Sequence, residues 1–284
     1  VRLHVVGVAI PGTAGPSADR PQTTVRIMTG AAVPPGWDSV IPVELTSGFD
    51  DNPVSVYKAA AKGQHIALRG AERPAASLVY SPGRRLSTAD VGGLAMVGCV
   101  QPRVFQRPVT AILATGNELV DPSQVPGPLQ IRNSNSATLH AQLSSYVARI
   151  ERLGVAPDHP DRLRDLLRAG LQADLLLVTG GVSAGAYDFV EEMLEDLGVA
   201  LHFRKVALQP GKPVTFGVHP RGCVLALPGN PVSAWTTFRL FGVPLLLHMQ
   251  GARRIRPGFE PLEADFEWQR KNPKWILFPG QIRD

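Results

Sequence analysis

The chain has 284 residues, a hydrophobic content of 44%, a charged content of 19% and a formal net charge of +5, which together indicate a globular protein of two or three domains and exclude a disordered one. It has no long run of one charge and only 6% aromatic residues, so we expect no nucleic-acid partner, and no apolar run is long enough to span a membrane. Its two cysteines, Cys99 and Cys223, form no disulfide framework or zinc motif and its first residues form no signal peptide, so we expect a cytoplasmic protein.

Residues 1–88 are predicted to form a β-rich domain. Short runs of apolar and β-branched residues alternate there with turn clusters such as Pro34-Pro35-Gly36. Strands at this spacing indicate a small barrel or sandwich. Residues 89–107 are expected to be a connector that includes a short helix, from Asp90 to Val97, capped by Ser87 or Thr88. The predicted strands are Val5 to Ile10, Val25 to Met28, Val40 to Val43, Val54 to Tyr57 and Gln64 to Leu68.

From residue 108 to residue 252 strands and helices alternate, which predicts a doubly wound α/β domain with a parallel sheet. Short apolar runs predict its strands. The expected strands are Val109 to Ala114, Leu175 to Val178, Leu201 to Val206 and Val224 to Leu227.

Apolar residues at helical spacing predict the helices of the same domain. The first has Ser134 or Asn135 as its predicted cap and carries Leu139, Leu143, Tyr146, Ile150 and Leu153 on one face. The next begins at Asp158, with Pro160 in its first turn, and a third runs from about Val190 to Gly198. The last runs from about Pro231 to Gln250, with Asn230 as its cap and Pro244 as a kink.

Residues 253–284 are expected to begin a further β domain that is incomplete. Phe266 to Arg270 and Trp275 to Phe278 are predicted to pair as its strands. The expected fold class is therefore multidomain α/β plus β, with the α/β domain between a β-rich domain and a partial C-terminal β domain.

Loops at the strand ends of the α/β domain are predicted to meet, because the loops after parallel strands lie along one edge of a sheet. These loops are residues 115–119, 179–188, 209–213 and 227–233. The second, rich in glycine, joins a buried strand to a helix and can bring backbone N–H groups close to an anion. A tight strand–helix turn that binds nothing explains the same loop. The charged residues expected at this edge are Glu118, Asp158, Asp188, Lys205 and Lys212, a mixture that suits a polyanionic substrate with a hard metal ion, although each lysine taken singly is also explained as a solvated side chain.

Five ordered motifs give the chain a specific resemblance to the MoeA family, the molybdopterin molybdenumtransferases related to the E domain of gephyrin. Residues Val25 to Ala31, followed by Pro34, Gly36 and Asp38, also resemble the second-domain signature of that family. The five motifs are Thr115-Gly116-x-Glu118-Leu119, Asn133-Ser134-Asn135, the segment from Thr179 to Asp188, Lys205-Val206 with Pro210-Gly211-Lys212-Pro213, and the segment from Leu227 to Ala234.

The resemblance implies a four-domain homodimer that inserts molybdate into adenylyl-molybdopterin with Mg²⁺ and releases AMP. It also implies a MogA-like enzyme as a partner. It implies that Asp188, Glu118 and Asp158 are catalytic, with Asp188 and Glu118 also binding the metal. Thr29 would reach the site of the dimer partner, although a turn-stabilising hydroxyl explains it equally well. The implied substrate-binding residues are Thr29, Asn133, Ser134, Asn135, Gly180, Gly181, Ser183, Gly185, Lys205, Lys212, Pro228, Gly229, Asn230, Pro231 and Ser233.

The chain departs from the family pattern in several places. Gln209 stands where the family often has a lysine, and Gly70-Ala71-Glu72 replaces a Gly-Glu-Asp segment. The Asp-Gly-Tyr-Ala segment that usually precedes the second domain is absent from the chain, and the fourth domain is cut short. Two alternatives remain: a MogA-like molybdopterin adenylyltransferase, and a non-catalytic gephyrin-type scaffold. The β-rich domain and the two Pro-Gly turns favour molybdenum insertion over the first, and the presence of both Glu118 and Asp188 argues against the second.

Overall fold

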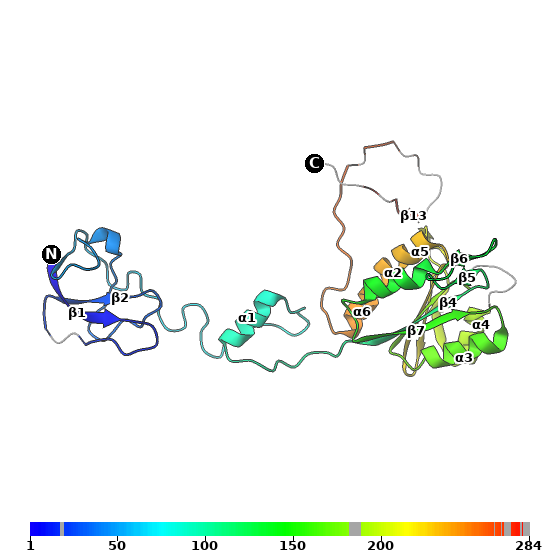
Figure 1. Cartoon of the computed structure of the whole chain (residues 1–284), viewed down its shortest axis with the longest axis horizontal. Helices are drawn as coiled ribbons and strands as arrows, with labels where there is room; N and C mark the ends of the chain where they lie inside the picture. The colour runs from blue at the N-terminus through cyan, green and yellow to red at the C-terminus, as the bar shows by residue number, and fades with distance from the viewer. Residues whose placement is uncertain are drawn as a thin grey trace. The chain divides into compact units, whose positions relative to one another are not determined.

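A computed structural model describes residues 1–17, 20–181, 189–263, 265–267, 269, 274–278 and 280 of the protein. The chain folds as two compact units, Val1–Leu78 and Val79–Asp284 (Figure 1). In the part of the chain that the structure describes, no helix has both the length and the apolar character needed to cross a membrane.

The first unit is built on a three-stranded sheet with the order β2-β1-β3. Strand β1 (Arg2–Ala9) lies between β2 (Thr23–Ile27), which runs parallel to it, and β3 (Val54–Ser55), which runs antiparallel. Two of the predicted strands are wrong. Val43 begins the 3-10 helix η1 (Val43–Leu45) just after a proline, and the segment at Gln64 is a turn in which His65 has a positive φ of 58°. Proline removes a ladder donor and a positive φ breaks an extended chain, so neither segment continues as a strand.

The second unit begins with helix α1 (Thr88–Met96). Its N-cap is Ser87, one of the two residues predicted for that position. Ser87 and Asp90 form a reciprocal capping box, and Arg84 donates to Asp90 Oδ1 at 2.8 Å. The hydrogen bond from Arg84, reinforced by the bonds from Ser87, lowers the pKa of the buried Asp90 carboxyl well below its ordinary value. This arrangement fixes the first turn of α1.

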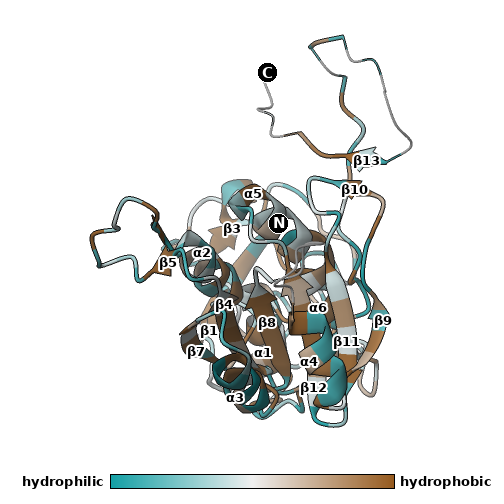
Figure 2. Cartoon of the chain, turned by 90° about the vertical axis from the view of Figure 1, so that its right-hand side faces the viewer, coloured by the Kyte–Doolittle hydropathy of each residue, from teal (hydrophilic) through white to brown (hydrophobic). Residues whose placement is uncertain are grey.

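A six-stranded sheet with the order β7-β4-β8-β12-β11-β9 forms the centre of the second unit. Strands β7, β4, β8 and β12 run parallel to one another, whereas β11 is antiparallel to both β12 and β9, so the sheet that was predicted to be parallel is mixed. Figure 2 shows β4 and β8 as strongly hydrophobic, as expected for central strands that are covered on both faces. The strands are β4 (Val109–Thr115), β7 (Arg149–Ala156), β8 (Leu175–Thr179), β9 (Ala200–Phe203), β11 (Thr215–His219) and β12 (Gly222–Leu227).

Helices cover both faces of this sheet, as the doubly wound prediction required. Alternate residues of each central strand enter different cores: in β8, Leu176 packs with α3 and α4, and Leu177 packs with α2, α5 and α6. The polar outer surface of α3 is evident in Figure 2. The helices are α2 (Ser134–Leu143), α3 (Pro160–Gly170), α4 (Val190–Asp196), α5 (Pro231–Thr237), the π-helix η2 (Phe238–Gly242) and α6 (Val243–Met249).

Three helix predictions need correction. The helix that begins near Ser134 ends at Leu143, and Ile150 and Leu153 lie instead on β7, which pairs with β4. Helix α3 has His159 as its N-cap residue, so Asp158 does not cap it. The predicted helix from Pro231 to Gln250 is interrupted by η2 just before Pro244, because a proline cannot donate the N–H that would continue the α-helical ladder.

Two short strand pairs complete the unit. Strand β5 (Leu119–Val120) pairs in parallel with β6 (Ile131–Arg132), and neither strand was predicted. Strand β13 (Trp275–Ile276) pairs with β10 (Leu208–Gln209) and not with the segment from Phe266, which was the prediction. The ring of Phe266 does meet that of Phe278, with 6.2 Å between the centroids, and Arg270 lies outside the described residues.

Candidate active site

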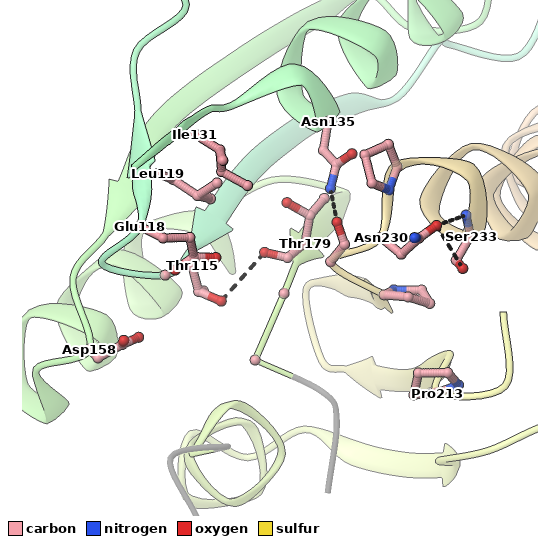
Figure 3. A pocket seen from close by; sticks show the side chains of 16 residues that line it. Thr115, Glu118, Leu119, Ile131, Asn135, Asp158, Thr179, Pro213, Asn230 and Ser233 are labelled. Atoms are coloured by element: carbon pink, nitrogen blue, oxygen red, sulfur yellow. Dashed lines mark hydrogen bonds between the residues drawn. The ribbon is translucent and has the colours of Figure 1, made fainter. Parts of the chain in front are cut away.

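A cleft of about 680 Å³ opens at the carboxyl ends of β4, β8 and β12 (Figure 3). Three of the four predicted loops meet there through several residues each, and the fourth contributes only Pro213, two residues before β11. The convergence follows from the parallel strands, whose loops necessarily leave the sheet at the same edge. The lining residues are Thr115, Gly116, Glu118, Leu119, Ile131, Asn135, Asp158, Thr179, Gly180, Gly181, Pro213, Pro228, Gly229, Asn230, Pro231 and Ser233.

Glycine is required at two positions on the cleft floor. Gly180 has a φ of +86°, and a Cβ there would lie 2.7 Å from the carbonyl oxygen of Thr115. Gly181 has a φ of +65°, and a Cβ there would lie 2.6 Å from Cγ2 of Val190. The Gly180 N–H donates to the carbonyl oxygen of Leu227 at 3.1 Å, which ties the loop to the neighbouring strand. The backbone of this loop therefore packs closely against β4 and α4, and there is no room for a side chain at either position.

Asparagine side chains hold the two neighbouring loops in place. Asn135 Nδ2 donates to the carbonyl oxygen of Gly229 at 2.8 Å, linking the start of α2 to the loop after β12. Asn230 caps α5, as predicted, and its Oδ1 accepts from Ser233 N at 3.1 Å and from Ser233 Oγ at 3.2 Å. The predicted cap of α2 is wrong: Asn133 occupies that position and accepts from Ser136 N. Asn133 is buried and does not line the cleft.

Two carboxylates, Glu118 and Asp158, line the cleft, and both residues are exposed. Asn117 Oδ1 accepts from the backbone N–H of Asp158 at 3.0 Å, which joins the two loops that carry these acids. A Cβ on Gly116 would overlap the carboxylate of Glu118, so the glycine gives that side chain room to fold back toward the cleft. Within the described ranges neither carboxylate forms an ion pair.

The cleft offers hard oxygen ligands but no complete protein cage for a metal. No three His, Cys, Asp or Glu side chains in the described part of the chain come together as metal ligands. One or two carboxylates with substrate phosphate oxygens is nevertheless the arrangement in which proteins commonly bind Mg²⁺, so Glu118 and Asp158 fit that ion. Asp188, the other predicted ligand, lies outside the described residues, as do Ser183 and Gly185.

The remaining predicted site residues lie off the cleft wall. Lys205 and Lys212 are exposed and do not line it, although their segments are joined by a hydrogen bond of 3.0 Å from Val206 N to the carbonyl oxygen of Lys212. Ser134 is exposed in the first turn of α2. Thr29 is exposed in the first unit, in the turn after β2.

Six residues of the lining were missed as site residues from the sequence: Thr115, Gly116, Leu119, Ile131, Thr179 and Pro213. Thr115 and Thr179 end their strands, and Thr115 Oγ1 donates to the carbonyl oxygen of Thr179 at 3.4 Å. Thr179 Oγ1 is buried and has no partner among the residues described. Leu119 and Ile131 come from β5 and β6. In the sequence, only the turn-rich stretch of residues 121–130 between these two short strands could have indicated that they pair.

Comparison with known proteins agrees with the resemblance seen in the motifs. Residues 111–248 match the family model of the probable molybdopterin binding domain, and residues 4–98 match the MoeA N-terminal region, domains I and II. The chain is similar to the molybdopterin molybdenumtransferase of Nostoc sp., at 34% identity over 266 residues, which cover 92% of this chain and 60% of that protein. It is similar to gephyrin of Dictyostelium discoideum, at 33% identity over 262 residues, which cover 82% of this chain and 36% of gephyrin.

A solved structure gives the same result. The crystal structure of the molybdopterin biosynthesis MoeA protein from Pyrococcus horikosii matches with a TM-score of 0.72 and 31% identity, over 88% of this chain and 63% of that one. The chain thus spans about 60% of the length of the Nostoc relative. Two matched family models, the curated relatives and this structure agree, and we conclude that the chain belongs to the MoeA family of molybdopterin molybdenumtransferases.

Proposed function

We propose that the protein acts in molybdenum cofactor biosynthesis, inserting molybdate into adenylyl-molybdopterin and releasing AMP. The observation that carries the proposal is the cleft itself. It combines a glycine floor at three strand ends with two carboxylates, Glu118 and Asp158, that form no ion pair within the described ranges. An adenylylated substrate carries a phosphate chain between two ring systems, and such a chain requires a close approach of backbone together with a hard cation.

In this proposal the substrate phosphates lie over Gly180, Gly181 and Gly229, which line the cleft and carry no side chain of their own. The hydroxyl of Thr179 is buried and has no partner among the described residues, so it can bond with a water held at the floor. Asn135 and Asn230 keep the loop after β12 in place, so that the floor is already formed before the substrate arrives. Preformed loops lose little entropy on binding.

Glu118, Asp158 and Asp188 would bind Mg²⁺, which when bound neutralises charge on the phosphates as AMP leaves. Glu118 and Asp158 then need only direct their carboxylate oxygens into the cleft that they line. Lys205, Lys212, Ser134, Ser183 and Gly185 remain proposed substrate contacts, as does the buried Asn133. The finer domain arrangement is also proposed: a MogA-like domain over residues 108–252 between two β domains, in a homodimer to which Thr29 contributes across the interface.

One assay separates this function from its two alternatives. The protein is incubated with adenylyl-molybdopterin, molybdate and Mg²⁺, and we measure AMP release and the activation of a cofactor-free molybdoenzyme. We expect both, and a Glu118→Gln variant should release AMP roughly 10²-fold more slowly. Glu192→Gln, which removes an exposed carboxylate of α4 outside the cleft, is the matched control and should keep the wild-type rate.

The alternatives give different results in the same assay. An adenylyltransferase would consume ATP and molybdopterin to form the adenylylated product. A scaffold would release no AMP above the rate without protein, and Glu118→Gln would change nothing.

A further inference from the structure

Two adjoining hollows lie in the second unit, at the end of the sheet opposite the cleft. One, of about 670 Å³, opens between residues 79–85 and residues 252–254, and the other, of about 520 Å³, extends from residues 80–86 along the segment 102–107. Arg107 lies just before β4, whose other end reaches the cleft. The length of that strand separates the hollows from the cleft by about 20 Å. We call the two hollows together the arginine hollow.

The lining of the arginine hollow carries positive charge from several arginines and, among the described residues, no carboxylate. Only Arg84 forms an ion pair in the part of the chain that the structure describes, and its partner is Asp90. Arginines elsewhere in the second unit do pair with carboxylates, as Arg164 does with Asp196. A hollow lined by charge of one sign raises the local concentration of ions of the opposite sign. The lining arginines are Arg84, Arg85, Arg103, Arg107, Arg253 and Arg254.

Aromatic rings hold two of these arginines in place. The guanidinium carbon of Arg84 lies 4.9 Å from the centroid of the Tyr80 ring, and that of Arg85 lies 5.5 Å from the centroid of the Tyr146 ring. A cation–π contact orients the guanidinium by its face and leaves the N–H groups at its edge able to donate. Both arginines can therefore bind an anion without giving up the ring contact.

A backbone hydrogen bond joins the two segments that bound the larger hollow. The N–H of Arg253 donates to the carbonyl oxygen of Gly83 at 3.0 Å. Gly83 has a φ of +79°, and a Cβ there would lie 2.6 Å from Cγ of Arg253, so this close approach requires glycine. The main chain is thus fixed on both sides of the hollow, and a ligand loses little affinity to ordering it.

We infer that the arginine hollow binds a small molecule that carries a diphosphate group, an inference independent of the function proposed above. A planar guanidinium can form two parallel N–H···O bonds to one phosphate, which adds geometric selection to the charge. The lining arginines come from three separate segments, so they suit phosphate oxygens spread over two linked groups. The volumes are those of small-molecule sites, and the chain has no long basic run of the kind that tracks a nucleic acid.

The test measures the affinity for inorganic diphosphate by calorimetry, in EDTA so that no Mg²⁺ holds the anion at Glu118 and Asp158. Arg85→Gln and Arg253→Gln each remove one charge, and neither arginine forms an ion pair within the described ranges. Each should weaken binding roughly tenfold, and the double variant roughly 10²-fold. Arg221→Gln is the matched control, because Arg221 is exposed between β11 and β12 and lines neither the hollow nor the cleft. It should keep the wild-type affinity, and thermal melting shows that all variants are folded.

A second titration, with ADP, identifies the source of the diphosphate group. Tighter binding of ADP than of inorganic diphosphate would identify a nucleoside diphosphate as the ligand. The reverse order would identify free diphosphate. Both results support the inference, provided that the double variant weakens the binding of the tighter ligand.

Four results would overturn the inference. Wild-type protein that binds neither diphosphate nor ADP would exclude the site. Unchanged affinity in the double variant would place the anion elsewhere on the chain. An equal loss in Arg221→Gln would show only an effect of net charge. A polyglutamate peptide that binds more tightly than either ligand, and that the double variant also weakens, would make the hollow a docking site for an acidic protein segment.

Discussion

Asn133 and Asn135 stand two residues apart at the start of α2, and the structure predicts that replacing them has opposite consequences. Asn133 is 4% exposed, and its side chain accepts from Ser136 N at 3.1 Å and donates to Ser136 Oγ at 2.9 Å. Asn133→Ala would leave a buried N–H and a buried hydroxyl without partners. The cost of the lost cap and the cost of the unsatisfied groups come from the same hydrogen bonds and do not add. We therefore expect the free energy of unfolding to fall by about 2–3 kcal/mol.

Asn135→Ala should cost much less stability and more function. Asn135 is only partly buried and makes one bond across the cleft, to the carbonyl oxygen of Gly229, which can bond with water instead. We expect a stability loss below about 1 kcal/mol. The loop after β12 loses its tether to α2, however, so AMP should bind more weakly.

Urea unfolding followed by far-UV circular dichroism checks the first expectation, because the long helices of the chain lie in the second unit. With an m-value of about 2 kcal/mol/M, a loss of about 2 kcal/mol lowers the midpoint by about 1 M. Asn133→Asp keeps the capping oxygen and is the control that should retain most of the stability. A normal midpoint for Asn133→Ala together with lost AMP binding would refute the reasoning, and would make Asn133 a ligand contact as the family resemblance implies.

Three further outcomes follow from the same structure. Gly181→Val should abolish ligand binding by unfolding the second unit, since the positive φ alone costs about 1–2 kcal/mol and the new side chain overlaps Val190; a folded variant on thermal melting would contradict this. Arg84 lowers the pKa of Asp90, so ionised Asp90 stabilises the fold above the ordinary Asp pKa of about 4, and this stabilisation is lost as the pH falls. The melting temperature of Asp90→Asn should therefore be below that of wild type at pH 7 and approach it toward about pH 2. A difference in melting temperature that does not change with pH would argue against the ion pair. Asp158→Asn should raise the Mg²⁺ concentration needed for AMP release and leave the melting temperature unchanged, because among the described residues only the backbone of Asp158 is bonded to the fold; equal Mg²⁺ titrations would exclude it as a ligand.

Local chemistry made several features predictable. The apolar runs of β4 and β8 are buried on both faces, a condition that only central strands meet. Asn230 caps α5 with Pro231 in the first turn, and both residue types act within one helical turn. The meeting of loops at the strand ends also followed from the sequence, because it depends only on the parallel order of the strands.

Other features depended on partners that are distant in the chain. Ile150 and Leu153 fit a helical period with Leu143, but the free edge of β4 recruits them into β7, and no local pattern reveals that edge. The site shows the same limit: Asn133 and Asn135 are chemically identical, yet only the packing of α2 buries the first and turns the second toward Gly229. Ile131 enters the cleft because a strand pair of two residues brings it beside Leu119. The sequence thus determined which residues could act, and the tertiary structure decided which of them face one cleft, because strand pairing and helix packing join residues that local propensity cannot relate.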